Sequence, residues 1–220
     1  MQTRTEKEIT DEFNTKLTEV YALLRNTVND LVLPWNLYVK KEELQAVITT
    51  LKDVYEVEDP SCKETLDIKS FQTHVPLKAQ MELALGYLYS KMWEQDHDKS
   101  CLEEAEKYLK LALDKTKNAH RSEADAVANA AAQELADVQY RMGSFHGDNA
   151  KPEVSQQFFK SARETLNTQR TVLAPGFMGE GARRHLETMD EVLQNSLKKS
   201  EQKPEQDKNS VNPVSTAPTP

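Results

Sequence analysis

Five histidines and two cysteines are the residues of this chain most suited to metal binding or nucleophilic chemistry. The histidines are dispersed, and no two lie four residues apart on one helical segment, the spacing that lets two imidazoles bind one metal ion. Asp96, His97 and Asp98 place two carboxylates beside an imidazole, but no second group of ligands is expected to converge on them. We therefore interpret this tripeptide as a solvated turn and predict no metal site.

Three further features have the residue types of catalytic or ligand-binding motifs. Residues 176–181 (Gly-Phe-Met-Gly-Glu-Gly) lack the preceding strand and the Lys-Ser/Thr pair with which glycine-rich loops hold phosphate. Cys62 lies among acidic residues, which raise a thiol pKa, whereas Cys101 follows an expected helix start, where a thiol pKa tends to be lower. Neither cysteine has a base nearby, and His185 on an apolar stripe fits a packing residue better than a pH switch. The sequence predicts no enzyme and no cofactor.

The composition is typical of a helical protein with a modest core. Of the 220 residues, 38% are hydrophobic and 29% are charged. The formal net charge of -8 disfavours nucleic acids, because phosphate binding needs clustered basic residues, and the same charge favours basic partners. The charged first residues contain no signal core, and no apolar run is long enough to span a bilayer. We expect a cytoplasmic protein, with a nuclear pool as the alternative, and no membrane partner.

A 50-residue echo is the strongest organising signal in the sequence. Residues 83–113 match the segment 50 positions further on, where Leu85 meets Leu135 and Leu109 meets Phe159. In both copies a polar turn follows the first apolar segment, and the second segment has a large apolar residue three positions before an alanine. Repeated helical hairpins have this pattern, and they stack because one hairpin cannot bury its own apolar face.

Non-repeating helices are predicted on both sides of the echo, from apolar spacings of three and four residues. A stripe from Ile9 to Leu31 ends at Pro34. Polar turns are expected at 94–99 and 147–151. Helices are predicted, in chain order, at residues 9–31, 40–57, 77–93, 101–117, 122–142, 152–168 and 178–199. A loop is expected at 58–74, and the chain divides into a helical repeat-like domain at 1–199 and a disordered tail at 200–220, where too few apolar residues offset the ordering entropy.

Two local signals mark helix ends inside the echo. Ser100 and Glu103 have the spacing of a capping box, in which each side chain accepts a hydrogen bond from the other residue's backbone N–H. Gly143 follows an alanine-rich helix and is expected to end it in a left-handed conformation.

The residues of the echo resemble the tetratricopeptide repeat. In that family a Leu-Gly pair lies on the first helix, and an alanine, a large apolar residue and another alanine follow on the second. The second copy departs from the pattern with Ala136 in place of the glycine and Ser155 in place of the first alanine, and both copies have a longer turn and lack the terminal proline. The resemblance covers residues 77–168 and implies an all-α stack of antiparallel helical hairpins, about seven helices in all. The matching positions are Leu85, Gly86, Tyr89, Ala105, Leu109, Ala112, Leu135, Phe159 and Ala162.

A fainter likeness is to the amino-terminal part of the family of the kinesin-family-binding protein. It is carried by Leu85-Gly86, the extended turn and the Glu103-Glu104 pair. That likeness implies a regulator that binds kinesin motor domains and blocks their engagement with microtubules. This chain is much shorter than such proteins.

A non-catalytic adaptor is the function that these patterns favour. Stacked hairpins form a groove in which a helix or extended peptide of a partner protein lies, and the first helix of each hairpin lines it. An oligomeric structural subunit, with residues 9–31 pairing between chains, is the alternative. The expected partner-binding residues are exposed positions of the first helices: Gln80, Tyr87, Lys91, Gln133, Gln139 and Arg141.

Overall fold

The computed structural model describes residues 11–20, 22, 40–57, 77–116, 122–148, 151–172, 187–188 and 190–199. These residues form helices and short connections, with no strand among them. The labelled helices are α2 (Lys41–Tyr55), α4 (Leu77–Asp96), α5 (Lys99–Thr116), α6 (Ser122–Asp148) and α7 (Pro152–Val172). Residues 11–20 are helical before α2, and residues 187–188 and 190–199 are helical after α7.

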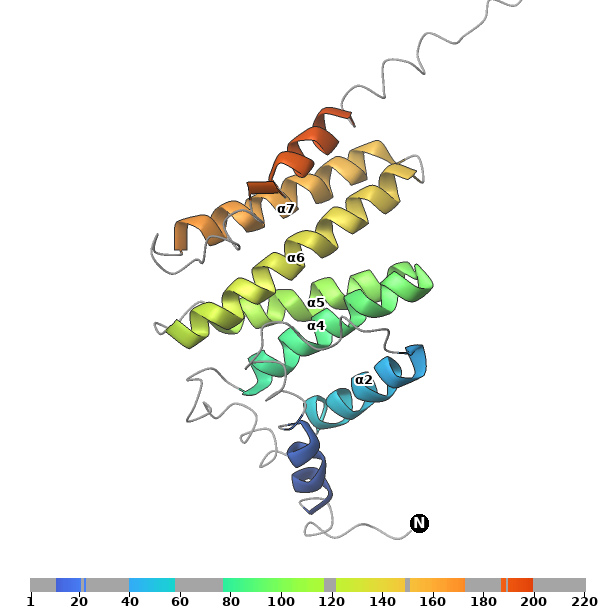
Figure 1. Ribbon diagram of the computed structural model, residues 1–220, viewed down its shortest axis with the longest axis vertical. Helices are drawn as coiled ribbons and strands as arrows, with labels where there is room; N and C mark the ends of the chain where they lie inside the picture. The colour runs from blue at the N-terminus through green and yellow to red at the C-terminus, as the bar shows by residue number, and fades with distance from the viewer. Residues whose placement is uncertain are drawn as a thin grey trace, which may run out of the picture.

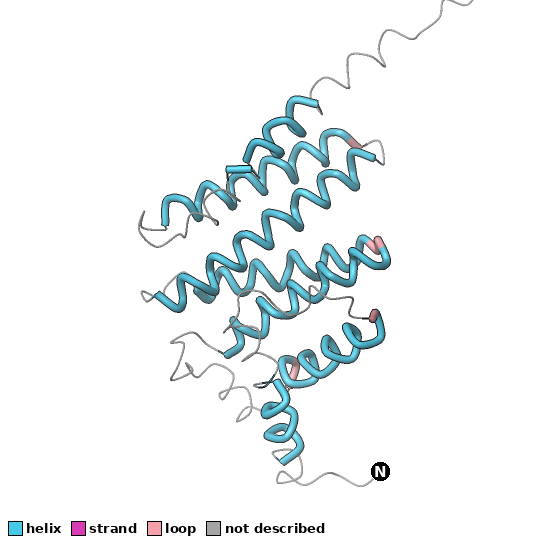
Figure 2. Tube along the Cα trace, in the orientation of Figure 1, coloured by secondary structure: helices cyan, strands magenta, loops and turns pink. Residues whose placement is uncertain are grey.

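The helices lie in chain order along one axis, and from α2 onward each is antiparallel to the next, whereas residues 11–20 cross α2 at a steep angle (Figure 1). α4 packs on α5 and α6 packs on α7, so that each pair is a hairpin closed by a short connection (Figure 2). α5 packs on α6 and joins the two hairpins, and α2 contacts α4. The predicted all-α stack of antiparallel helical hairpins is therefore confirmed. Below, α4 and α6 are called the first helices of the two hairpins, and α5 and α7 the second helices.

Four apolar clusters hold this stack together, each shared by helices that contact one another. The first joins residues 11–20 to α2, α4 and α5, and it contains Phe13, Leu17 and Val20 of the predicted amino-terminal stripe. The second lies mainly between α5 and α6, the third joins α6 and α7 to Leu193, and a small fourth joins α4 to α6. The described part of the amino-terminal stripe is thus buried within its own chain.

The matching positions of the echo form the centre of these clusters. All but Tyr89 are buried, and Tyr89 is half-buried, with its ring stacked on Tyr108 at 5.9 Å between centroids. Leu109 packs against Gly86, where an added Cβ would lie 2.5 Å from the leucine Cγ. Phe159, the counterpart of Leu109, packs in the same way against Gly143. In the second hairpin the glycine at the close approach is therefore Gly143. The sequence match with Gly86 indicates Ala136 instead, which lies about two helical turns earlier.

Both predicted helix ends inside the echo are wrong. α4 continues through Asp96, so the turn consists of His97, which has a positive φ of 53°, and Asp98. The cap of α5 is Asp98, whose Oδ1 accepts a hydrogen bond from the Ser100 backbone N–H at 3.0 Å, while Glu103 pairs with Lys99.

Gly143 is not a left-handed cap, because α6 runs through it to Asp148 and no described glycine has a positive φ. The polar residues expected at both turns are compatible with a helix. Packing against the opposite helix therefore extends α4 and α6 beyond their predicted ends.

Several predictions lie outside the described residues. These are the loop at 58–74, the tail at 200–220, the glycine-rich segment at 176–181, and the side chains of Cys62, His74, His120 and His185.

Candidate binding surface

Three of the six residues predicted to bind a partner lie together where the two first helices meet. Tyr87 and Lys91 come from α4 and Arg141 comes from α6. α4 and α6 contact each other directly, although α5 separates them in the sequence. The hairpin stack thus places side chains from distant parts of the chain on one surface.

The other three predicted residues do not join this group. Gln139 is 1% exposed, because α6 is covered by α5 on one side and by α7 on the other. Its Nε2 donates to Ser161 Oγ at 2.9 Å and to Glu106 Oε1 at 3.2 Å, so it ties α6 to both second helices. Gln80 is also buried and Gln133 is half-buried. The prediction that Gln80 and Gln139 are exposed is wrong.

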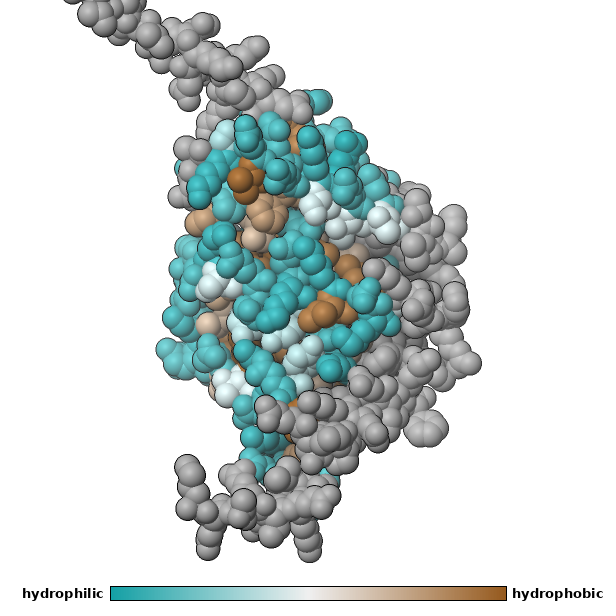
Figure 3. Space-filling view, turned by 180° about the vertical axis from the view of Figure 1, so that it is seen from behind, coloured by the Kyte–Doolittle hydropathy of each residue, from teal (hydrophilic) through white to brown (hydrophobic). Residues whose placement is uncertain are grey.

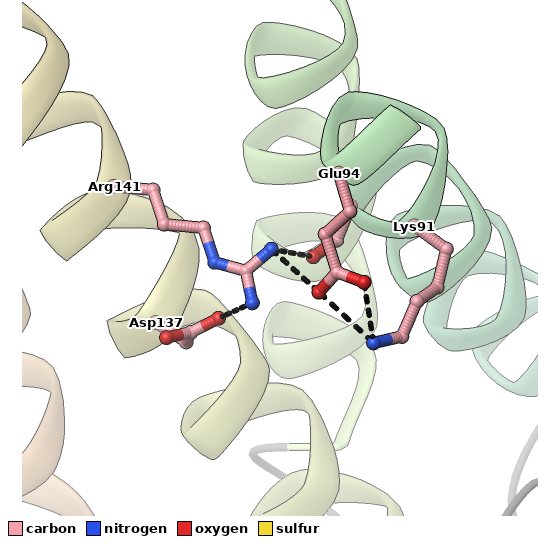
Figure 4. A network of polar contacts seen from close by, with 5 residues as sticks. Lys91, Glu94, Asp137 and Arg141 are labelled. Carbon is pink, nitrogen blue, oxygen red and sulfur yellow. Dashed lines mark hydrogen bonds and ion pairs between the residues drawn. The ribbon is translucent and has the colours of Figure 1, made fainter. Parts of the chain in front are cut away.

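Arg141 is the centre of the group (Figure 4). Its guanidinium pairs with Glu94 Oε1 of α4 at 2.9 Å and with Asp137 Oδ2, one turn earlier on α6, at 2.6 Å. It also lies over the ring of Trp93, with Cζ 5.2 Å from the ring centroid. One planar cation therefore bridges both first helices, and an arginine suits this role because its donors form a fixed fork.

Lys91 completes the group from the α4 side. Its Nζ donates to both oxygens of Glu94 at 2.9 Å, and it lies 5.5 Å from the centroid of the Tyr87 ring. Glu94 therefore accepts from two cations at once. Burial alone would raise the pKa of this carboxyl, but the contacts with Lys91 and Arg141 outweigh it and lower the pKa.

Glu134 is the third carboxylate of the group, one turn before Asp137 on α6. Its side chain bonds with Ser90 of α4 and forms no ion pair with the described residues. Burial raises its pKa and Asp137 adds to this shift, whereas Ser90, Arg141 and Lys91 oppose it without cancelling it. Burial also raises the pKa of Tyr87 to about 12, with contributions from Glu134 and Glu94.

We call this surface the α4–α6 network, defined by Tyr87, Lys91, Glu94, Glu134, Asp137 and Arg141. Its charged groups are open to solvent in part, with exposed fractions of 36% for the Glu94 side chain, 29% for Asp137 and 21% for Arg141. The three carboxylates were missed from the sequence. The spacings of Lys91 to Glu94 and of Asp137 to Arg141 are ordinary helical pair spacings and could have indicated them.

A second polar cluster lies on the other side of α4. The Glu82 side chain has no exposed area, and it accepts hydrogen bonds from Lys115 of α5 and from the hydroxyl of Tyr55 of α2, the latter at 2.8 Å. This carboxylate ties three helices together inside the stack. It is enclosed by protein groups, so we assign it a role in packing.

Two other reactive side chains among the described residues, Cys101 and His97, lie at the turn between α4 and α5. Cys101 is buried, and burial followed by the nearby Asp98 and Asp96 raises its pKa, the reverse of the effect that a helix start tends to have. His97 is exposed and packs edge-on against Trp93. Within the described ranges no group of three His, Cys, Asp or Glu side chains could hold a metal ion. No described helix has the length and apolar character needed to cross a membrane.

No protein-family model matches the chain, and no curated protein matches it. A solved structure described as "DHF58 filament" is similar over 92% of this chain and 99% of its own, with 15% sequence identity and a TM-score of 0.35. A likeness of this size supports neither a relationship nor a function.

Proposed function

We propose that the protein is a non-catalytic scaffold that binds a helix or an extended segment of a partner protein on the α4–α6 network. One observation supports this proposal. Two helices that belong to different hairpins bring an aromatic ring, two cations and three carboxylates to one partly exposed surface.

Such a surface has the properties of a recognition site. Its residues lie on long helices fixed by packing rather than on loops, which keeps their geometry constant. Half-buried aromatic and arginine side chains are the residue types that contribute most to protein–protein binding. The first helices of stacked hairpins commonly line the inner surface on which peptides bind.

One face of the molecule is mostly polar where its residues are described. The face drawn in Figure 3 is mostly hydrophilic, with separate small hydrophobic areas rather than one continuous patch. Large contiguous apolar patches mark interfaces that depend on hydrophobic burial.

Site-specific photocrosslinking tests the proposal. A benzophenone amino acid in place of Tyr87 is expected to crosslink a defined partner protein in cells. The same amino acid in place of Lys110, an exposed residue of the second helix α5, is the matched control and should not crosslink it. Identical crosslinked products from the two positions, or none from Tyr87, would contradict a binding surface at the α4–α6 network.

A further inference from the structure

The α4–α6 network contains more negative than positive side chains. Its cations are Lys91, which pairs with Glu94, and Arg141, which pairs with Glu94 and Asp137. Both cations are thus occupied by two of the three carboxylates. Glu134 bonds with the hydroxyl of Ser90 and forms no ion pair with the described residues, although the charges of Lys91 and Arg141 favour its ionised form in part.

This leftover carboxylate is unfavourable for the isolated fold. Glu134 is half-buried, and Asp137 lies three positions further along the same helix, where like charges repel. Burial and the second carboxylate both disfavour the ionised form, which is why the pKa of Glu134 is raised. A cation supplied from outside would relieve both effects.

The orientation of Asp137 suits such a cation. Asp137 uses Oδ2 for Arg141, and its other carboxylate oxygen points away from the guanidinium in Figure 4. This oxygen and the carboxylate of Glu134 belong to successive positions of one helical face. Two partly exposed carboxylates spaced in this way suit the ammonium of a lysine or the fork of an arginine.

The first helices are also more acidic than the second helices. The first helices α4 and α6 contain eight acidic and three basic residues, whereas the second helices α5 and α7 contain six acidic and seven basic residues. Removing the buried Glu82 from the count leaves the first helices strongly acidic. Negative charge is therefore concentrated on the helices that form the network, and it favours the approach of a positive partner.

We infer, on the basis of the proposed scaffold function, that the partner segment is basic and that one of its Lys or Arg side chains binds between Glu134 and Asp137, beside the Tyr87 ring. Complementary charge selects the partner, and the internal pairs of Lys91 and Arg141 keep the surface in shape before binding. The site takes a cation of peptide origin and rejects acidic segments.

The test uses the full chain and three capped nonapeptides of equal length, composed of alanine with arginine, with glutamine or with glutamate. Binding is followed by chemical-shift changes of the Tyr87 and Asp137 amides at about 0.15 M salt, where attraction over distances beyond about 8 Å is screened. The arginine peptide is expected to bind at least about tenfold more tightly than the other two. Glu134→Gln is expected to remove most of that difference.

Glu104→Gln is the matched control, because Glu104 is a partly exposed carboxylate of α5 that pairs with Lys107 at 3.0 Å. It should change the affinity less than twofold. Equal losses from the two variants would show unspecific attraction to an acidic protein and would overturn the inference.

A ligand-free measurement separates a binding role from a structural one. Since Ser90, Lys91 and Arg141 offset the burial of Glu134 only in part, Glu134→Gln is expected to raise the unfolding temperature, by about 2–4 °C for a chain of this size. A lower unfolding temperature would show that the carboxylate stabilises the fold, and the inference would be lost.

The outcomes for the basic partner and for the scaffold are distinguishable. If the glutamine or glutamate peptide shifts Tyr87 and Asp137 with the affinity of the arginine peptide, the scaffold proposal stands and the basic partner is wrong. If no peptide shifts these amides at millimolar concentration, the inference fails, and photocrosslinking at Tyr87 alone then decides the scaffold proposal.

Discussion

The ring of Phe159 lies directly against the backbone of Gly143, so that a Cβ atom on the glycine would lie 2.5 Å from the ring Cε1. Only a residue without a side chain allows this approach between α6 and α7. The contact is the counterpart of Gly86 against Leu109 in the preceding hairpin. In both hairpins, therefore, a large side chain of the second helix packs on the backbone of a glycine in the first helix.

Gly143→Ala is expected to destabilise the fold by about 1–2 kcal/mol, because the overpacking of about 1–3 kcal/mol exceeds the helix propensity that alanine gains. Chemical denaturation measures the change. In a double-mutant cycle with Phe159→Ala, the losses should not add, since the smaller side chain makes room for the new methyl group. Strictly additive losses would contradict the close approach.

Arg141→Met should destabilise the protein by about 1–2 kcal/mol, a value that allows for the partial exposure of its ion pairs. The substitution removes the bridge between α4 and α6 and leaves the charges of Glu94 and Asp137 close together. Lys107→Met is the control, because its pair with Glu104 and its contact with the Tyr108 ring both lie within α5 and bridge no helices. A control that loses as much stability as Arg141→Met would show that the bridge between helices adds nothing.

His146 should make the fold sensitive to mildly acidic pH. The side chain is 7% exposed and stacks on Phe158 at 5.5 Å between centroids. Burial, followed by Lys99 and Lys151, lowers its pKa below 6.5, while Glu103 opposes this shift. The unfolded chain therefore takes up the proton first, so the stability that the neutral imidazole allows is present above about pH 6.5 and declines as the pH falls below it.

The measurement is the free energy of unfolding of the wild type and of His146→Phe between pH 7.5 and 5. The difference between the two should move in favour of the variant as the pH falls, because the variant has no proton to take up. Parallel profiles across this range would count against a role for His146.

Glu82→Gln is expected to cost about 1.5–3 kcal/mol, the range for a buried hydrogen bond to a charged group. The carboxylate accepts from Lys115 and Tyr55, which belong to different helices. Glu56→Gln, in an exposed pair with Lys52, is the control and should change stability by less than about 0.5 kcal/mol. Thermal unfolding followed by circular dichroism gives both values, and equal effects would show that Glu82 behaves as a surface residue.

Helix periodicity was sufficient to predict the fold. The spacing of Leu44, Ile48 and Leu51 placed α2 within about two residues of its ends, as helix boundaries usually allow. The ends of α4 and α6 were wrong for a common reason. Residues 94–96 are polar and residues 144–148 are mostly so, but neither segment prevents a helix. The sequence alone could not show that packing against the next helix would extend α4 and α6 through them.

The binding surface was predictable only in part. Positions Tyr87 and Lys91 follow from the face of α4, but the pairing of Glu94 with Arg141 depends on how two hairpins stack. Gln139 was wrongly predicted to be exposed for the same reason. The second helices of both hairpins, α5 and α7, cover a position that a single hairpin would leave exposed. Local patterns determine which residues share a helix face, and the arrangement of the hairpins determines which faces meet.

The division of the apolar interior into separate clusters has a mechanical consequence. None of the clusters extends through the whole stack, so we expect a force that pulls its two ends apart to act first on the terminal interfaces. The terminal helices would detach while the contact between α5 and α6 stays intact. Under tension we expect the stack to unfold and lengthen in steps rather than in a single event.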